Sequence, residues 1–207
     1  MVNEIEERLK QSSIQNTIVN YRLKNLKRKK GTNMTNIIFL DVDGVLNSYP
    51  YAKSLPEIDD LDNHAETEHD EIRDYHVQML SKIYHSCNAK IVLSSTWRQL
   101  NNVKTPECRK MYKYLTDCLS KHGMEIIDQT PVIGLNRPQE IAAWLDERQD
   151  KDDINFVILD DDFPKERYDD YGIGDYLVHT DFFSRTIDEG GLQESHVQQA
   201  IAILQKK

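Results

Sequence analysis

The chain has few cysteines, no long apolar run and no secretion signal. Its three cysteines, Cys87, Cys108 and Cys118, are odd in number and show no metal-binding spacing, so we expect reduced thiols without a function. No apolar stretch is long enough to cross a bilayer, and the charged N-terminus lacks the apolar core of a signal peptide. These absences argue against a disulfide-stabilised secreted scaffold and a membrane-spanning protein, and they predict a cytoplasmic protein.

The body of the chain is also poor in basic residues. Residues 1–33 hold eight Lys/Arg and three Asp/Glu, a net charge of +5, whereas residues 34–207 hold 18 and 32, a net charge of −14. Such an acidic body argues against broad gripping of a nucleic-acid backbone, although a local basic groove is compatible with it. The basic run at residues 22–30 either contacts nucleic acid or an acidic partner, or forms a solvated helix face or tail. We therefore predict an N-terminal extension over residues 1–33, helical or flexible, followed by one domain over residues 34–207.

Strand-like and helix-like segments alternate after residue 34. Residues 47–73 read as a loop. The expected strands are 36–41, 90–93, 124–127, 155–159 and 176–178, and the expected helices are 75–87, 106–121, one opened by Pro138 and one after 190–191. This alternation predicts an α/β fold, with a parallel sheet covered by helices on both faces.

The first expected strand ends in two acidic residues. The apolar run from Ile37 to Leu40 is followed by Asp41, Asp43 and then Gly44. Ligands of open α/β sheets bind at the carboxyl ends of the strands, and residues two apart in an extended segment face the same side. A calcium loop would need further oxygen ligands and a final glutamate at fixed offsets, which do not follow here. An ordinary turn would not require the second carboxylate, so we predict a site at this strand end.

Polar residues end three of the expected strands. The pairs are Asp41 and Asp43, Ser94 and Ser95, and Asp160 and Asp161. Two aspartates from different strands can hold Mg²⁺, which prefers oxygen ligands. Serine hydroxyls and backbone amides beside the ion can bind phosphoryl oxygens.

Four segments resemble, in order, the motifs of the haloacid dehalogenase-like (HAD) superfamily of phosphatases. They are FLDVDGVL, IVLSSTWR, LNRPQEIAAWL and FVILDDD, and the resemblance covers about residues 36–205. It implies a Rossmann-like parallel sheet with a minimal cap. It also implies a magnesium-dependent phosphoric monoester hydrolase that works through an aspartyl-phosphate. Dehalogenating members lack the second aspartate, so Asp43 favours phosphoryl transfer.

The first motif supplies the catalytic carboxylates of that superfamily. By resemblance, Asp41 is the nucleophile and a magnesium ligand. Asp43 is the general acid that protonates the leaving oxygen and then the base that activates water. Its contribution to the metal site comes mainly from its backbone carbonyl.

The other motifs supply the phosphate and metal contacts. Ser94 is the expected phosphate-binding hydroxyl and Ser95 its alternative, while Arg137 matches the cation of the third motif. Asp161 is the expected magnesium ligand of the fourth motif, supported by Asp160. Neither choice within the two pairs follows from the sequence.

Three of these segments further resemble a group related to nucleic-acid-repair phosphatases. The short insertions between the motifs predict a nearly capless fold, a form often used on large substrates. We expect a phosphorylated substrate, a nucleotide or a phosphorylated nucleic-acid end, and no membrane partner. The alternatives are a catalytically silent HAD-fold binding or regulatory module and a phosphotransferase. The sequence leaves the oligomeric state open.

Several other side chains allow two interpretations. Arg98 either binds a second phosphate or nucleic-acid backbone, or pairs with a neighbouring acid. Trp97 is expected to be packed. His64, His69 and His76 stand among acidic residues, but their spacing matches no strong metal motif, so we favour an acidic loop.

Overall fold

The computed structural model describes residues 34–55, 71–101 and 105–206. The predicted N-terminal extension lies outside the described residues, and so do His64, His69 and most of the predicted loop. None of the helices in these ranges has the length and apolar character needed to span a membrane.

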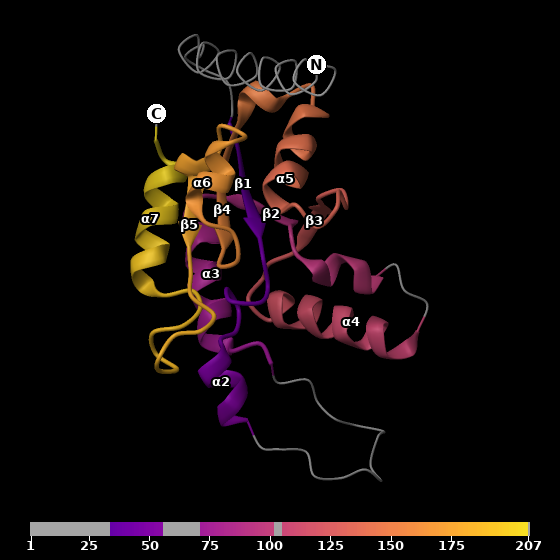
Figure 1. Ribbon diagram of the computed structural model, residues 1–207, viewed down its shortest axis with the longest axis vertical. Helices are drawn as coiled ribbons and strands as arrows, with labels where there is room; N and C mark the ends of the chain where they lie inside the picture. The colour runs from indigo at the N-terminus through magenta and orange to yellow at the C-terminus, as the bar shows by residue number, and fades with distance from the viewer. Residues whose placement is uncertain (1–33, 56–70, 102–104, 207) are drawn as a thin grey trace, which may run out of the picture.

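A five-stranded parallel sheet forms the centre of the domain (Figure 1). Its strands are β1 (Thr35–Leu40), β2 (Ala89–Leu93), β3 (Ile126–Gln129), β4 (Ile154–Asp160) and β5 (Leu177–His179). Their order is β3-β2-β1-β4-β5, and all four pairings are parallel. The predicted α/β fold is confirmed. The third strand begins two residues later than predicted, at Ile126.

The described part of the chain contains six α-helices. They are α2 (Tyr49–Ser54), α3 (Asp74–Ser86), α4 (Pro106–Ser120), α5 (Arg137–Asp146), α6 (Lys165–Asp169) and α7 (Glu194–Leu204). Short 3-10 helices cover Thr96–Asn101, Lys151–Asp153 and Gly174–Tyr176. The prediction of a loop throughout residues 47–73 was wrong at α2, which has no buried residue and therefore no apolar stripe to reveal it.

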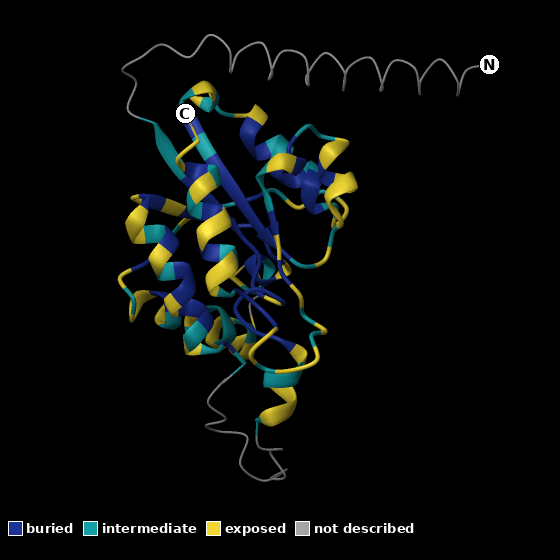
Figure 2. Cartoon of the chain, turned by 90° about the vertical axis from the view of Figure 1, so that its left-hand side faces the viewer, coloured by how far each residue is buried: buried dark blue, intermediate teal, exposed yellow. Residues whose placement is uncertain are grey.

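The strands place alternate side chains in two cores, one on each face of the sheet. Ile38 and Leu40 face a core that includes buried residues of α3, α4 and α7, whereas Ile37 and Phe39 face a core with residues of α5 and α6. This division follows from the two-residue period of an extended chain. Figure 2 shows helices that carry both buried and exposed residues around the buried central strands of the sheet.

Hydrogen bonding of the sheet continues one residue beyond the ends of the central strands. The amide of Asp41 donates to the carbonyl of Leu159 at 3.0 Å, and the amide of Ser94 donates to that of Leu40 at 2.8 Å. The first polar residue after β1 therefore lies directly beside the ends of β4 and β2. This register brings the predicted motifs to one edge of the sheet.

Candidate active site

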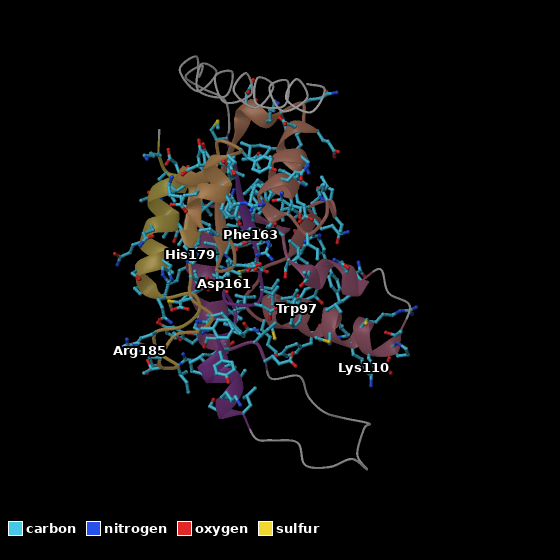
Figure 3. The ribbon with its side chains drawn as sticks, viewed as in Figure 1. Trp97, Lys110, Asp161, Phe163, His179 and Arg185 are labelled. Atoms are coloured by element: carbon cyan, nitrogen blue, oxygen red, sulfur yellow. The ribbon has the colours of Figure 1, made fainter. Side chains whose placement is uncertain are left out.

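Three carboxylates converge at the ends of β1 and β4. Asp41, Asp160 and Asp161 each offer an oxygen, and these oxygens all lie within 4.8 Å of one another. Asp41 and Asp160 are buried and Asp161 is partly buried. Figure 3 shows Asp161 near the middle of the molecule, below the sheet. Parallel pairing of β1 with β4 produces this acidic cluster, because the two motifs end at the same level.

Arg137 supplies a positive charge to the acidic cluster. It is the first residue of α5, and its guanidinium donates to Asp41 Oδ2 at 2.5 Å and also to Asp160 Oδ2. The guanidinium lies 5.7 Å from the ring centroid of Phe163. Residue spacing could not predict these contacts, because Asp41 and Asp160 are 96 and 23 positions away from Arg137 along the chain.

Asp160 has both carboxylate oxygens engaged within the protein. Oδ2 accepts from Arg137 and from the Tyr168 hydroxyl at 2.8 Å, while Oδ1 accepts from the amides of Asp162 at 2.8 Å and Phe163 at 3.3 Å. Such a carboxylate fixes the loop after β4. It has less capacity left for a metal ion than Asp161.

Gly44 makes room for the Asp161 carboxylate. A Cβ atom at Gly44 would lie 2.0 Å from Asp161 Cγ and 2.3 Å from Oδ1. The glycine also has a φ of +70°, in the left-handed region that side chains disfavour. Glycine at position 44 therefore allows both the left-handed turn after β1 and the close approach of the Asp161 carboxylate, which follows β4.

The cluster carries more negative charge than Arg137 neutralises. Burial, together with repulsion from Asp160, raises the pKa of Asp41 to about 8, although Arg137 opposes the rise. Burial and the neighbouring Asp160 and Asp162 raise the pKa of Asp161 to about 7. Both pKa shifts indicate that the negative charge of these carboxylates is not fully balanced by nearby positive charge. A divalent cation that prefers oxygen ligands, such as Mg²⁺, fits this set of donors.

Asp43 is not one of the three clustered carboxylates and accepts hydrogen bonds from two other side chains. Its Oδ1 accepts from Asn47 Nδ2 and its Oδ2 from Trp97 Nε1, both at 2.9 Å. Asn47 also accepts from the amide of Gly44 at 2.9 Å. Trp97 is buried, as predicted, but its bond to Asp43 was not anticipated. Asn47 was missed, and the only signal was its place four residues after Asp43.

The two serines after β2 have different surroundings. The Ser95 hydroxyl accepts from the amide of Trp97 at 3.4 Å and lies near enough to the Asp41 carboxylate to lower its pKa. The Ser94 hydroxyl is buried and makes no hydrogen bond within the described residues. The geometry thus favours Ser95 as the serine beside the nucleophile, and the choice between them stays a prediction.

Arg98 forms a buried ion pair with Glu140. The two groups lie 2.7 Å apart, and each side chain is 2% exposed. Arg98 also donates to the carbonyl of Ser95 at 2.7 Å, while Glu140 accepts from the amide of Ile133 at 2.7 Å. Arg98 therefore ties the loop after β2 to α5, one turn from Arg137. The phosphate-binding interpretation of Arg98 was wrong, and the ion-pair interpretation is confirmed.

His76 is a buried residue of α3 and not part of the acidic cluster. Its Nδ1 lies 2.9 Å from the carbonyl oxygen of Leu192, and burial lowers its pKa to about 4. His64 and His69, the other two histidines of this group, lie outside the described residues.

Comparison with known proteins identifies the family. No curated protein and no solved structure matches the chain significantly. The family model described as "HAD domain in Swiss Army Knife RNA repair proteins" matches residues 37–197, which is most of the chain and includes all four motifs. The chain therefore belongs to the HAD superfamily, within the group of HAD domains found in RNA repair proteins.

Proposed function

We propose that the protein is a magnesium-dependent phosphatase that hydrolyses phosphate monoesters through an aspartyl-phosphate on Asp41. HAD membership supports a phosphohydrolase in general terms. The observation that carries the finer proposal is the position of Asp41, buried between the Arg137 guanidinium and the other carboxylates of the acidic cluster.

The reaction uses the two aspartates of the first motif in turn. A carboxylate oxygen of Asp41 attacks the phosphorus, and the bond from phosphorus to the leaving oxygen breaks. Asp43 donates its proton to that oxygen and becomes a carboxylate. Asp43 then takes a proton from water as the water attacks the phosphorus, which releases inorganic phosphate and restores both aspartates.

Charge compensation decides whether a carboxylate can attack a phosphate monoester. Arg137 holds Asp41 Oδ2 and the amide of Val42 holds Oδ1 at 2.8 Å, so the nucleophile is oriented before substrate arrives. Mg²⁺ bound by Asp41 and Asp161 would neutralise the phosphoryl oxygens. Arg137 and the Ser95 hydroxyl provide the remaining contacts to these oxygens.

The surroundings of Asp43 suit a group that exchanges protons. Asp43 is exposed, so water and a leaving group can reach it, while Asn47 and Trp97 fix both of its oxygens. Substrate entry must release one of these bonds for Asp43 to donate a proton. We assign Asn47 and Trp97 as positioning residues.

We propose a phosphorylated RNA end as the substrate. The family description points to RNA repair, and Asp43 is exposed, so a large substrate can reach it. A silent binding module would not need the complete set of nucleophile, acid, cation and metal ligands that the chain retains. A phosphotransferase would reveal itself by transferring phosphate to added alcohols or nucleosides.

The proposal is tested by hydrolysis of an aryl phosphate and of phosphorylated oligonucleotides with and without Mg²⁺. Asp41→Asn should abolish turnover, and Asp43→Asn should lower kcat by about 10²- to 10⁴-fold, the usual contribution of a general acid. Asp150→Asn, at an exposed position outside the cluster, is the matched control and should keep full activity. Full activity of Asp41→Asn would refute the mechanism.

A further inference from the structure

Three aromatic rings form an exposed surface next to the candidate active site. Tyr49 and Phe183 are 44% and 76% exposed, and Phe182 is partly buried. Their ring centroids lie 4.9 to 6.3 Å apart. Phe183 is the most exposed of the large apolar side chains in the described ranges. We call these three residues the aromatic shelf.

The aromatic shelf is held together by the backbone. The amide of Tyr49, at the start of α2, donates to the carbonyl of Phe182 in the loop after β5 at 2.9 Å. In the same loop, a Cβ atom at Gly190 would lie 2.5 Å from Ser48 Cβ, so the two segments approach closely. The rings are therefore arranged before any ligand binds, which reduces the entropy cost of binding.

Both segments of the aromatic shelf lead directly from the candidate active site. Tyr49 follows two residues after Asn47, which donates to Asp43, and Phe182 follows two residues after Thr180, whose amide donates to the Asp160 carbonyl. Two residues span at most about 7 Å, and successive nucleotides of one strand rise about 3.4 Å. Tyr49 and Phe182 therefore each lie within about 7 Å along the chain of a residue that is hydrogen-bonded to an aspartate of the site, a span that a few nucleotides can cover. Figure 1 shows α2 and the loop after β5 at the end of the sheet to which the strand arrows point.

Basic side chains stand beside the rings. Lys53 Nζ lies 5.6 Å from the centroid of Tyr49. Arg185 is exposed two residues after Phe183 and is labelled on this loop in Figure 3. The loop also carries the exposed acids Asp181, Asp188 and Glu189, of which Asp188 is paired with Arg73 at 3.0 Å. Exposed rings with neighbouring cations are the arrangement by which proteins bind single-stranded nucleic acid, with bases on the rings and phosphates on the cations.

We propose that the aromatic shelf stacks a base of the single-stranded nucleic acid whose terminal phosphate enters at Asp41. This inference rests on the proposed function, since it takes the phosphate site as the anchor of the strand. A protein partner fits less well. Each aromatic side chain buries at most about 150–250 Å², and these three are already partly buried, so together they supply less than the roughly 800 Å² per partner of a stable protein interface.

The first experiment compares two substrates in the full chain with Mg²⁺. One is a short RNA with a terminal phosphate, and the other is glycerol phosphate, which has no ring to stack. Phe183→Ala and Tyr49→Ala should each lower kcat/KM for the RNA by about 5- to 150-fold, the effect of losing one base contact. Both variants should leave kcat/KM for glycerol phosphate unchanged, and Phe183→Trp should retain activity on RNA.

A matched control uses another exposed apolar residue, in the segment before α5 and not in α2 or the loop after β5. Leu135 is 60% exposed and lines a pocket of about 480 Å³ together with Thr96, Trp97, Gln99, Leu100 and Met111. Leu135→Ala should leave kcat/KM for the RNA unchanged. A loss with Leu135→Ala but not with the shelf variants would place the base in this pocket and overturn the proposal.

Binding without turnover separates this inference from the proposed function. Fluorescence anisotropy of the labelled RNA is measured with EDTA present, for the wild type and the shelf variants. Weaker RNA binding by Phe183→Ala and Tyr49→Ala supports base stacking on the aromatic shelf, whether or not a phosphate ester is hydrolysed. An absence of hydrolysis would refute only the phosphatase proposal. The inference would be overturned if all variants bound the RNA equally, or if the shelf variants lost kcat/KM equally on RNA and glycerol phosphate. It would also be overturned if the shelf changes weakened binding of an aromatic phosphopeptide more than binding of RNA.

Discussion

Replacing Gly44 by alanine should damage the metal site more than the fold. The new Cβ would stand 2.0 Å from Asp161 Cγ, whereas a Cβ contact below 3.0 Å is essentially never seen, so the Asp161 carboxylate must move by at least about 1 Å. The left-handed backbone adds a cost of about 1–2 kcal/mol. A displaced ligand should weaken Mg²⁺ binding by at least about 10-fold, the scale seen when the groups that orient a metal ligand are removed.

Gly134→Ala is the matched control for Gly44→Ala. Gly134 has a φ of +61°, close to that of Gly44, but a Cβ there would meet nothing within 4 Å. Both variants share the backbone cost, and only Gly44→Ala displaces Asp161.

Thermal unfolding with and without Mg²⁺ measures the difference. At a concentration 100 times the wild-type Kd, Mg²⁺ stabilises by about 2.7 kcal/mol, and a 10-fold weaker site would retain about 1.4 kcal/mol. The gain in Tm from Mg²⁺ should therefore be about 3–5 °C smaller in Gly44→Ala than in Gly134→Ala. Equal gains in the two variants would refute the assignment of Asp161 as the metal ligand beside Gly44.

Three further predictions follow from buried charges. Removing either partner of the Arg98–Glu140 pair should cost about 3–5 kcal/mol, and Arg98→Met with Glu140→Leu should cost less than the two single changes together; additive losses in urea unfolding would contradict the pairing. Because the pKa of His76 is lowered from 6.5 to about 4, its contribution of about 3 kcal/mol is present above pH 6.5 and lost as the pH falls towards 4. His76→Gln should flatten the dependence of unfolding free energy on pH between about pH 6.5 and pH 4. A variant with the same slope as the wild type would contradict this role of His76. The pKa values of Asp41 and Asp161 are raised to about 8 and about 7, so Mg²⁺ must displace protons from them at low pH. The increase in Tm caused by Mg²⁺ should therefore grow between about pH 6 and pH 8.5. An increase that does not depend on pH would refute the claim that the negative charge of these carboxylates is uncompensated.

The central sheet was predictable because its strands combine strong local signals with a simple rule of assembly. Ile37 to Leu40 form an apolar run ended by acids, and the carboxyl ends of parallel strands share one edge. That rule was enough to bring Asp41 and Asp161 together. The short helix α2 was missed because no side chain in it is buried, so burial left no pattern in the sequence.

The contacts that organise the site were not predictable from local patterns. Trp97 and Asp43 are 54 positions apart, and Arg98 and Glu140 are 42 positions apart. Each pair forms only because the loop after a strand folds back, and this conformation cannot be predicted from the spacing of residues in the sequence. For the same reason the two alternatives for Arg98 were decided only by its burial against Glu140.

Chemical trapping of the covalent intermediate tests the central claim most directly. The enzyme is quenched during turnover of a phosphate monoester with Mg²⁺ and treated with borohydride, which reduces an aspartyl-phosphate to homoserine. Peptide mass spectrometry then identifies the modified residue. The account predicts homoserine at Asp41 alone, dependent on substrate. Rapid turnover with Asp41 unmodified, or with homoserine at another aspartate, would contradict it.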